Sequence, residues 1–230
     1  KGKTGKKMAG RITELVEQFY ARVAPEDIVS ASVENLYGAP ASLLKVGASR
    51  KANTPIVRAG NPEAKKDGWT TPNTVIEIIN DDMPFLVDSV TQGLAQAGYA
   101  VQLAVHPIVF VKRNAAGKMT ELLPDDRSGD DVTVESWIHV QVEHQATAKG
   151  LREIERLLKS ILSDVRAAVE DWKPMLARLH ETITTMKLTP PPLDTEEVEE
   201  ATAFLEWMAD NHFTLLGVRE YEYSGAKGPE

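Results

Sequence analysis

One short stretch constrains the fold most, because an apolar run there meets an acidic turn and then a helical pattern. Residues 74–79 read TVIEII and are β-branched at five of six positions, which favours a strand over a helix. The polar residues Asn80, Asp81 and Asp82 follow and predict the end of that strand. Pro84 suits the first turn of a helix, and apolar residues then recur at helical spacing until Gly98. The stretch therefore predicts a strand, an acidic turn and an amphipathic helix in direct succession.

The turn between this strand and this helix is the candidate small-molecule site. The first turn of a helix leaves backbone N–H groups unpaired, and we expect those of residues 83–86 to bind the carboxylate of an amino acid. Asp81 and Asp82 could instead form an acid–base pair or bind a cation. In a purely structural alternative, one of them caps the helix and the other faces solvent. The predicted ligand-binding residues are Asn80, Asp81, Asp82, Met83, Pro84, Phe85, Leu86 and Val87.

Composition argues against several classes of partner. The formal net charge is -8, so the chain lacks the basic surface with which proteins bind nucleic acid. It has no cysteine, which excludes disulfides and fits a reducing cytoplasm. No apolar run approaches the roughly 20 residues that a membrane-spanning helix needs. We expect a cytoplasmic protein with no nucleic-acid partner and no membrane partner. Because the sequence opens on Lys1, we also expect a piece of a longer protein.

Other elements are predicted on both sides of the central stretch. Before it we expect helices over residues 8–23, from Pro25 onward and over residues 41–49, a short strand over 55–59, and a loop over 65–72 anchored by Trp69. After it we expect strands over 101–112 and 135–143, an exposed loop over 124–131 between them, and a long helix over 148–170 that continues through 172–186 with a bend at Pro174. The chain then predicts a stiff spacer at residues 190–192, a helix capped by Asp194 or Thr195, and a strand over 213–223.

This order of elements predicts an α+β fold of the ferredoxin-like kind, βαββαβ, with two helices on one face of an antiparallel sheet. An N-terminal helical segment and a C-terminal helical extension flank it. The fourth strand does not follow the second helix, so either residues 55–59 or residues 213–223 would complete the sheet. We expect three parts: an N-terminal tail with helices and a loop (1–72), the ferredoxin-like domain with its extended second helix (73–186), and a proline-rich linker that begins another segment (187–230).

The sequence carries no established catalytic motif. It contains no Gly-x-Gly-x-x-Gly nucleotide fingerprint, no Gly-x-Ser-x-Gly elbow and no His-Glu-x-x-His metal motif. His139 and His144 are an odd number of residues apart, so they would lie on opposite faces of a strand and could not share a metal ion. We therefore predict no catalytic residue, no metal site and no bound cofactor in this chain.

Several segments together resemble a known family. The longest is Asn-Asp-Asp-Met-Pro-Phe-Leu-Val-Asp-Ser at residues 80–89, and shorter ones lie at 35–38, 106–107, 135–137, 164–172 and 210–217. They resemble the N-terminal region of the large NAD-dependent glutamate dehydrogenases of bacteria. The resemblance implies ACT-like modules, which are ferredoxin-like and often bind amino acids, with the dehydrogenase core far downstream. It also implies ligand contacts at residues 80–87, although Phe85 follows Pro84 where many such turns carry glycine.

The resemblance predicts a catalytically silent regulatory and assembly module. The parent enzyme would convert L-glutamate, NAD and water into 2-oxoglutarate, ammonia and NADH, with NAD bound outside this chain. Expected partners are an amino-acid effector, the other domains of the parent chain and further copies of the same protein. A free-standing amino-acid-binding ACT-like protein is the alternative. A small independent enzyme that uses Asp81 and Asp82 is a third interpretation.

Overall fold

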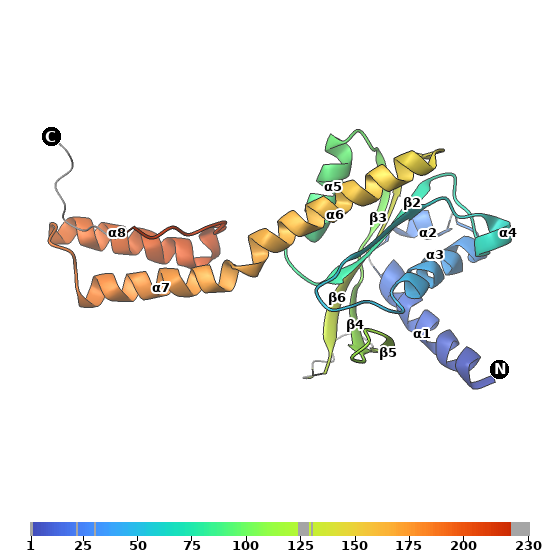
Figure 1. Cartoon of the computed structure of the whole chain (residues 1–230), viewed down its shortest axis with the longest axis horizontal. Helices are drawn as coiled ribbons and strands as arrows, with labels where there is room; N and C mark the ends of the chain where they lie inside the picture. Colours follow the sequence, from blue (N-terminus) through green and yellow to red (C-terminus); the bar gives the residue numbers. More distant parts are fainter. Residues whose placement is uncertain (1, 22, 30, 124–128, 130, 222–230) are drawn as a thin grey trace. The chain divides into compact units, whose positions relative to one another are not determined.

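The structure is a computed structural model that describes residues 2–21, 23–29, 31–123, 129 and 131–221 (Figure 1). It divides into two compact units, residues 1–165 and residues 166–230. Helix α6 (Ala148–Glu170) begins in the first unit and ends in the second. No helix in the described ranges is long and apolar enough to cross a membrane.

The first unit contains a six-stranded antiparallel sheet. Its order is β1 (Ile56–Gly60), β2 (Thr74–Asp81), β6 (Thr133–Val142), β4 (Ile108–Arg113) and β5 (Met119–Leu123), and β3 (Val101–Val105) also pairs with β6. The central strand β6 pairs with β2 along its length, with β4 near its start and with β3 near its end. The α+β class is therefore confirmed. Of the two candidates for the additional strand, residues 55–59 supply it as β1, which pairs with β2.

The strand predicted over residues 74–79 is confirmed but extends further. Asn80 and Asp81 continue β2, where they lie opposite Ser136 and Glu135 of β6. The prediction that these residues end the strand is wrong, because pairing with a neighbouring strand outweighs their local preference for turns. Only Asp82 and the residues after it form the turn.

Helices cover both faces of the sheet, which corrects the prediction of helices on one face (Figure 1). Helices α5 (Leu86–Gln96) and α6 lie on one side, and α1 (Gly2–Tyr20) and α3 (Val33–Val46) lie on the other. Along β6, Ile138 and Val140 therefore face one helical layer while Trp137 faces the other, and all three are fully buried. Each such side chain contributes roughly 1.5–3 kcal/mol by leaving water.

The strand predicted over residues 101–112 is interrupted. His106 and Pro107 separate β3 from β4, which is consistent with proline having no N–H for the ladder. The carbonyl of Pro107 accepts a hydrogen bond from the Trp137 amide at 3.0 Å, so the break still contacts β6. Strand β5, which forms a hairpin with β4, was not predicted. Most of the loop predicted over residues 124–131 lies outside the described residues.

The N-terminal helices differ from the prediction in their boundaries. Helix α1 begins at Gly2 rather than near residue 8, α2 covers Pro25–Val29, and α3 runs from Val33 to Val46 as one helix. The predicted loop at residues 65–72 contains the short helix α4 (Ala64–Asp67), and the expected anchoring by Trp69 is confirmed because this side chain is buried. Gly38 of α3 lies against it, where an added Cβ would come within 2.3 Å of the Trp69 side chain.

The second unit consists mainly of helices. Helix α7 (Trp172–Leu188) is separated from α6 at Asp171, so the predicted bend at Pro174 is wrong; Pro174 lies in the first turn of α7, which tolerates proline. Helix α8 (Thr195–Trp207) has Asp194 at its N-cap position, one of the two positions predicted, but the Asp194 side chain makes no capping hydrogen bond. The helix continues into a π-helical turn, η1 (Met208–His212). Residues 213–221 form no strand, so that prediction is wrong for them; residues 222 and 223 lie outside the described ranges.

Candidate functional site

The eight predicted ligand residues differ in their burial. Asn80 is buried within β2, whereas Asp82, Pro84 and Phe85 are exposed in the turn and Leu86 is buried at the start of α5. Four of the cavities formed by described residues have no wall residue between positions 80 and 87. Ligand binding by these eight residues therefore stays a prediction.

The acidic residues of the turn have other partners than the helix. The N-cap residue of α5 is Phe85, which adopts the left-handed conformation with φ of 67°. Asp82 accepts a hydrogen bond from the Ser136 hydroxyl at 2.6 Å, and its amide donates to the Val134 carbonyl at 3.1 Å. The proposed capping by Asp81 or Asp82 is wrong. The backbone N–H groups of residues 83–86 were expected to lie together in the first turn of a helix. Helix α5 starts only at Leu86, so those of residues 83–85 precede it.

Asp81 belongs to a buried ion network centred on Glu135. The Glu135 carboxylate accepts five hydrogen bonds: from Arg50 Nε at 3.0 Å and Nη2 at 2.8 Å, from Arg113 Nε at 2.7 Å and Nη2 at 2.8 Å, and from Trp137 Nε1 at 2.8 Å. Arg50 Nη2 also donates to Asp81 Oδ1 at 2.6 Å. The two arginines and the two acids balance in charge, and nearly every donor and acceptor in the network has a partner.

This network holds the segment after α3 on the sheet. Arg50 lies beyond the end of α3, while Asp81, Arg113 and Glu135 lie on three different strands. Burial by itself lowers the pKa of Arg50, but hydrogen bonds and charge attraction from Asp81 and Glu135 outweigh burial and raise it. Sequence reasoning missed the network. The only local signal is Glu135 two residues before Trp137 on a strand, which places both side chains on one face.

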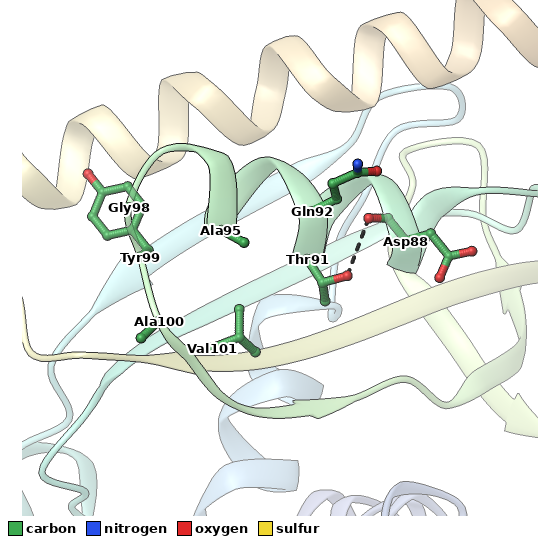
Figure 2. A pocket seen from close by; sticks show the side chains of 8 residues that line it. All are labelled: Asp88, Thr91, Gln92, Ala95, Gly98, Tyr99, Ala100 and Val101. Atoms are coloured by element: carbon green, nitrogen blue, oxygen red, sulfur yellow. Dashed lines mark hydrogen bonds between the residues drawn. The ribbon is translucent and has the colours of Figure 1, made fainter.

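A first cavity lies beside α5 and the start of β3, next to the predicted turn (Figure 2). Its volume is about 760 Å³, and its wall includes Asp88, Thr91, Gln92 and Tyr99. The Thr91 hydroxyl donates within its own helix, to the Val87 carbonyl at 2.8 Å. Figure 2 shows the remaining side chains spread along the helix and the following loop, and none of the eight lining residues is buried. This groove has no buried polar group that would orient a ligand.

A second cavity, on the opposite face of the sheet, contains a buried carboxylate. Its volume is about 330 Å³, and Glu77 of β2 lines it together with residues from β1, α3, α4 and α6. Glu77 is only 3% exposed. Its Oε2 lies 3.3 Å from Arg58 Nη1, and its Oε1 has no hydrogen-bond partner among the described residues. Burial raises the pKa of Glu77, an effect that the nearby Ser42 hydroxyl and the Arg58 charge only partly oppose.

A buried histidine lies near this carboxylate on the neighbouring strand. His139 of β6 lies opposite Glu77 in the strand register and is completely buried between the rings of Phe19 and Trp69. Burial lowers the pKa of His139 to about 4, so the imidazole is neutral near pH 7. Its Nδ1 has no hydrogen-bond partner within the described part of the chain. No group of three metal-ligating side chains occurs among the described residues.

Comparison with known proteins gives a consistent family. The family model described as glutamate dehydrogenase, ACT1 domain, matches residues 15–158, which is more than half of the chain. This match includes all six strands of the sheet and most of the helices that pack on it.

Curated relatives agree with this match. The NAD-specific glutamate dehydrogenase of Pseudomonas aeruginosa is 33% identical over 217 residues, which cover 94% of this chain and 13% of that protein. The NAD-specific glutamate dehydrogenase of Halomonas elongata is 32% identical over 97% of this chain and 14% of its own length. A third, from Mycobacterium tuberculosis, is 29% identical over 62% of this chain. The chain therefore spans only a small part of the length of the relatives it matches.

Proposed function

The chain belongs to the glutamate dehydrogenase ACT1 domain family, and from this premise we propose that it is the non-catalytic regulatory and assembly module of a large NAD-specific glutamate dehydrogenase. The family match over residues 15–158 carries this proposal. The parent enzyme would oxidise L-glutamate with NAD and water to 2-oxoglutarate, ammonia and NADH. NAD and the catalytic residues would be supplied by parts of the parent enzyme outside this chain.

In this proposal the sheet of the first unit is an ACT-like module with an unusual fourth strand. The elements follow one another in the order β2, α5, the interrupted strand β3–β4, β6 and α6. This order matches the first five elements of a βαββαβ unit. β1 lies beside β2, at the edge where the fourth strand of such a unit pairs. The N-terminal segment would thus replace the strand that normally follows the second helix.

A catalytic role for the acidic turn is disfavoured by its contacts. Asp81 is ion-paired with Arg50, and Asp82 accepts a hydrogen bond from the Ser136 hydroxyl. A general acid or base needs to reach a substrate proton at hydrogen-bond distance. Two carboxylates committed to separate protein partners fit a structural role better than an acid–base pair.

Assembly is supported by apolar surface on the second unit. Phe204 and Trp207 of α8 stack at 5.9 Å between ring centroids, and Trp207 stacks on His212 at 5.1 Å, although both aromatic side chains of α8 are about half exposed. Leu216 and Tyr221 in the following segment are also exposed. Clustered exposed aromatic residues are typical of protein interfaces. We propose that this surface contacts other domains of the parent chain or a second copy of it.

The assembly role can be tested in the parent enzyme with paired surface variants. Replacing Phe204 and Trp207 with serine should shift the molar mass measured by light scattering to a smaller species. Replacing Glu199 and Glu200, which are exposed on the same helix, with serine provides the control. An unchanged mass in the aromatic variant would remove the assembly role.

The non-catalytic assignment has its own test. The purified 230-residue chain, mixed with L-glutamate and NAD, should produce no NADH by absorbance at any glutamate concentration. NADH production by this chain, abolished by replacing Asp81 and Asp82 with asparagine, would overturn the assignment and favour the small-enzyme interpretation.

A further inference from the structure

The cavity beside Glu77 is the strongest unassigned site in the molecule. Its volume of about 330 Å³ is at the lower end of the range for small-molecule pockets and could hold roughly ten water molecules. The walls come from β1, β2, α3, α4 and α6, around the sheet face that α3 covers. The lining includes Ser42, Arg58, Gly60, Lys66, Trp69 and Glu77.

Most polar groups of this cavity already have partners in the protein. The Asn61 side chain accepts from Thr74 Oγ1 at 2.7 Å and donates to the Gln145 carbonyl at 3.0 Å. Asp67 Oδ2 accepts the Glu63 amide at 2.9 Å. Glu77 differs from these groups: the Ser42 hydroxyl and Arg58 lie near its carboxylate, but its Oε1 is buried and accepts no hydrogen bond from the described residues. An acceptor in this condition destabilises the fold unless another molecule donates to it.

We propose that this cavity binds a small ligand through a primary ammonium group that donates a hydrogen bond to Glu77 Oε1. A cationic N–H donor matches a buried carboxylate better than a neutral donor does, because charge-assisted hydrogen bonds are stronger. The ammonium ion and the amino group of an α-amino acid share this chemistry. An amino acid could in addition place its carboxylate near the Arg58 and Lys66 side chains, which line the same cavity.

A divalent metal ion fits the site less well. Such ions take six or more oxygen ligands, usually from several carboxylates, whereas no cluster of three acidic or imidazole ligands is present in the described ranges. The proposal also relocates the effector site expected at residues 80–87. The binding itself stands independently, and only its consequence for the enzyme rests on the proposed regulatory function.

The test uses the 230-residue chain in which the side-chain carboxyl carbon of each glutamate residue is labelled with ¹³C. The ¹³C resonance of the Glu77 carboxyl would be followed while ammonium chloride, glycine or potassium chloride is added at equal ionic strength. Potassium is the matched control, since it has the charge and nearly the size of ammonium but no N–H group. We expect a saturable shift with ammonium chloride or glycine and none with potassium chloride. Saturation by ammonium chloride alone would identify the ion as the ligand, and tighter binding of glycine would identify an amino acid.

Two variants separate binding at this site from a general effect of salt. Glu77→Gln should weaken binding at least tenfold, measured by the ligand-induced rise in melting temperature. Gly60→Leu provides an independent variant: an added Cβ at Gly60 meets no atom within 4 Å, and Gly60 shares the strand face of Arg58 in the cavity wall. The leucine should fill the cavity and weaken binding while Glu77 stays in place. Asp88→Asn, in the groove beside α5, should bind as the wild type does.

The proposal is overturned if potassium shifts the Glu77 resonance as ammonium does, or if neither ammonium chloride nor glycine shifts it. It is also overturned if folded Gly60→Leu chain binds as the wild type does. None of these results bears on the mass of the parent enzyme or on its aromatic surface, so the assembly role could stand while this site fails. Conversely, binding here with no effect on NADH production by the parent enzyme would contradict only the regulatory role.

Discussion

Two glutamates on the same face of the sheet are both buried, yet their surroundings differ. Glu135 on β6 accepts five hydrogen bonds from two arginines and a tryptophan. Glu77 on β2 has one ion pair at 3.3 Å, to an arginine whose side chain is 47% exposed, a nearby Ser42 hydroxyl, and one oxygen without a hydrogen-bond partner in the described structure. Burial alone therefore does not distinguish a structural carboxylate from a candidate ligand site. The number of donors that surround it does.

The difference follows from what packs over each residue. The end of α3 and the segment after it bring Arg50 and the Gly47 carbonyl over Glu135, where the Gly47 carbonyl also accepts from Arg113 at 2.9 Å. Over Glu77 the same helical layer leaves a cavity. One carboxylate thus anchors the N-terminal segment to the sheet, and the other lines a space that a ligand can enter.

The largest expected effect comes from removing the cation between Glu135 and Asp81. Arg50→Met should lower the free energy of unfolding by about 3–5 kcal/mol, because it leaves the two acids Glu135 and Asp81 with Arg113 as the one remaining cation of the network. The matched control is Arg58→Met beside Glu77, where the arginine is half exposed and the loss should be at most about 1 kcal/mol. Urea unfolding followed by circular dichroism measures both. Equal losses would remove the distinction between the two glutamates.

The buried side chains of Glu77 and His139 predict opposite dependences of folding stability on pH. The pKa of His139 falls from 6.5 to about 4 on folding, so the unfolded chain binds more protons between these values and stability should fall as the pH is lowered from 6.5 to 4. At about 1.4 kcal/mol per pH unit for one proton, this contribution reaches about 3 kcal/mol. The pKa of Glu77 is instead raised above 4.5, so its contribution is largest below pH 4.5 and is lost as the pH rises through the raised value.

Single variants should reveal these two slopes. Relative to the wild type, His139→Phe should gain stability as the pH falls from 6.5 towards 4, and Glu77→Gln should gain stability as the pH rises above 4.5. Guanidinium unfolding at intervals of half a pH unit measures both differences. If neither variant changes the slope of stability against pH, the pKa values of Glu77 and His139 do not shift on folding in the directions given above.

The smallest effects concern the acidic turn. Asp81→Asn should cost about 1–2 kcal/mol, because it weakens the 2.6 Å ion pair with buried Arg50. Asp82→Asn should cost less than about 0.5 kcal/mol, since this residue is exposed and its amide oxygen can still accept the Ser136 hydroxyl. Differential scanning calorimetry of both variants checks the order. The reverse order would mean that Asp82, and not Asp81, supports the fold.

The elements with strong local patterns could be predicted from the sequence, and the contacts between distant segments could not. The β-branched run at residues 74–79 and the helical stripe of α6 were predicted because spacing alone determines which face is apolar. The second helical layer was not predicted, because nothing near residues 137 and 139 indicates that α1 and α3 cover them. The break at Pro107 and the continuation of β2 through Asp81 depend likewise on what β6 pairs with.

Ligand binding at residues 80–87 stays a prediction, but the local geometry assumed for it differs from the structure. The residues from Asn80 to Val87 are adjacent in sequence, and the prediction assumed that a helix would start at Pro84 and present its amides together. The left-handed Phe85 moves that start to Leu86. The Glu77 cavity instead combines residues as far apart as Ser42 and Leu151, a grouping that only the fold produces.

One comparison tests the central claim most directly: the free energies of unfolding of Glu135→Gln and Glu77→Gln at pH 7, measured by urea denaturation against the wild type. Both changes keep the size of the side chain and remove a buried negative charge. We predict a loss of at least about 3 kcal/mol for Glu135→Gln, because two buried arginines lose their counter-charge. For Glu77→Gln we predict a change within about 1 kcal/mol, because little in the protein compensates the charge that is removed. A loss of about 3 kcal/mol in both variants would contradict the account, since Glu77 would then be as firmly built into the fold as Glu135.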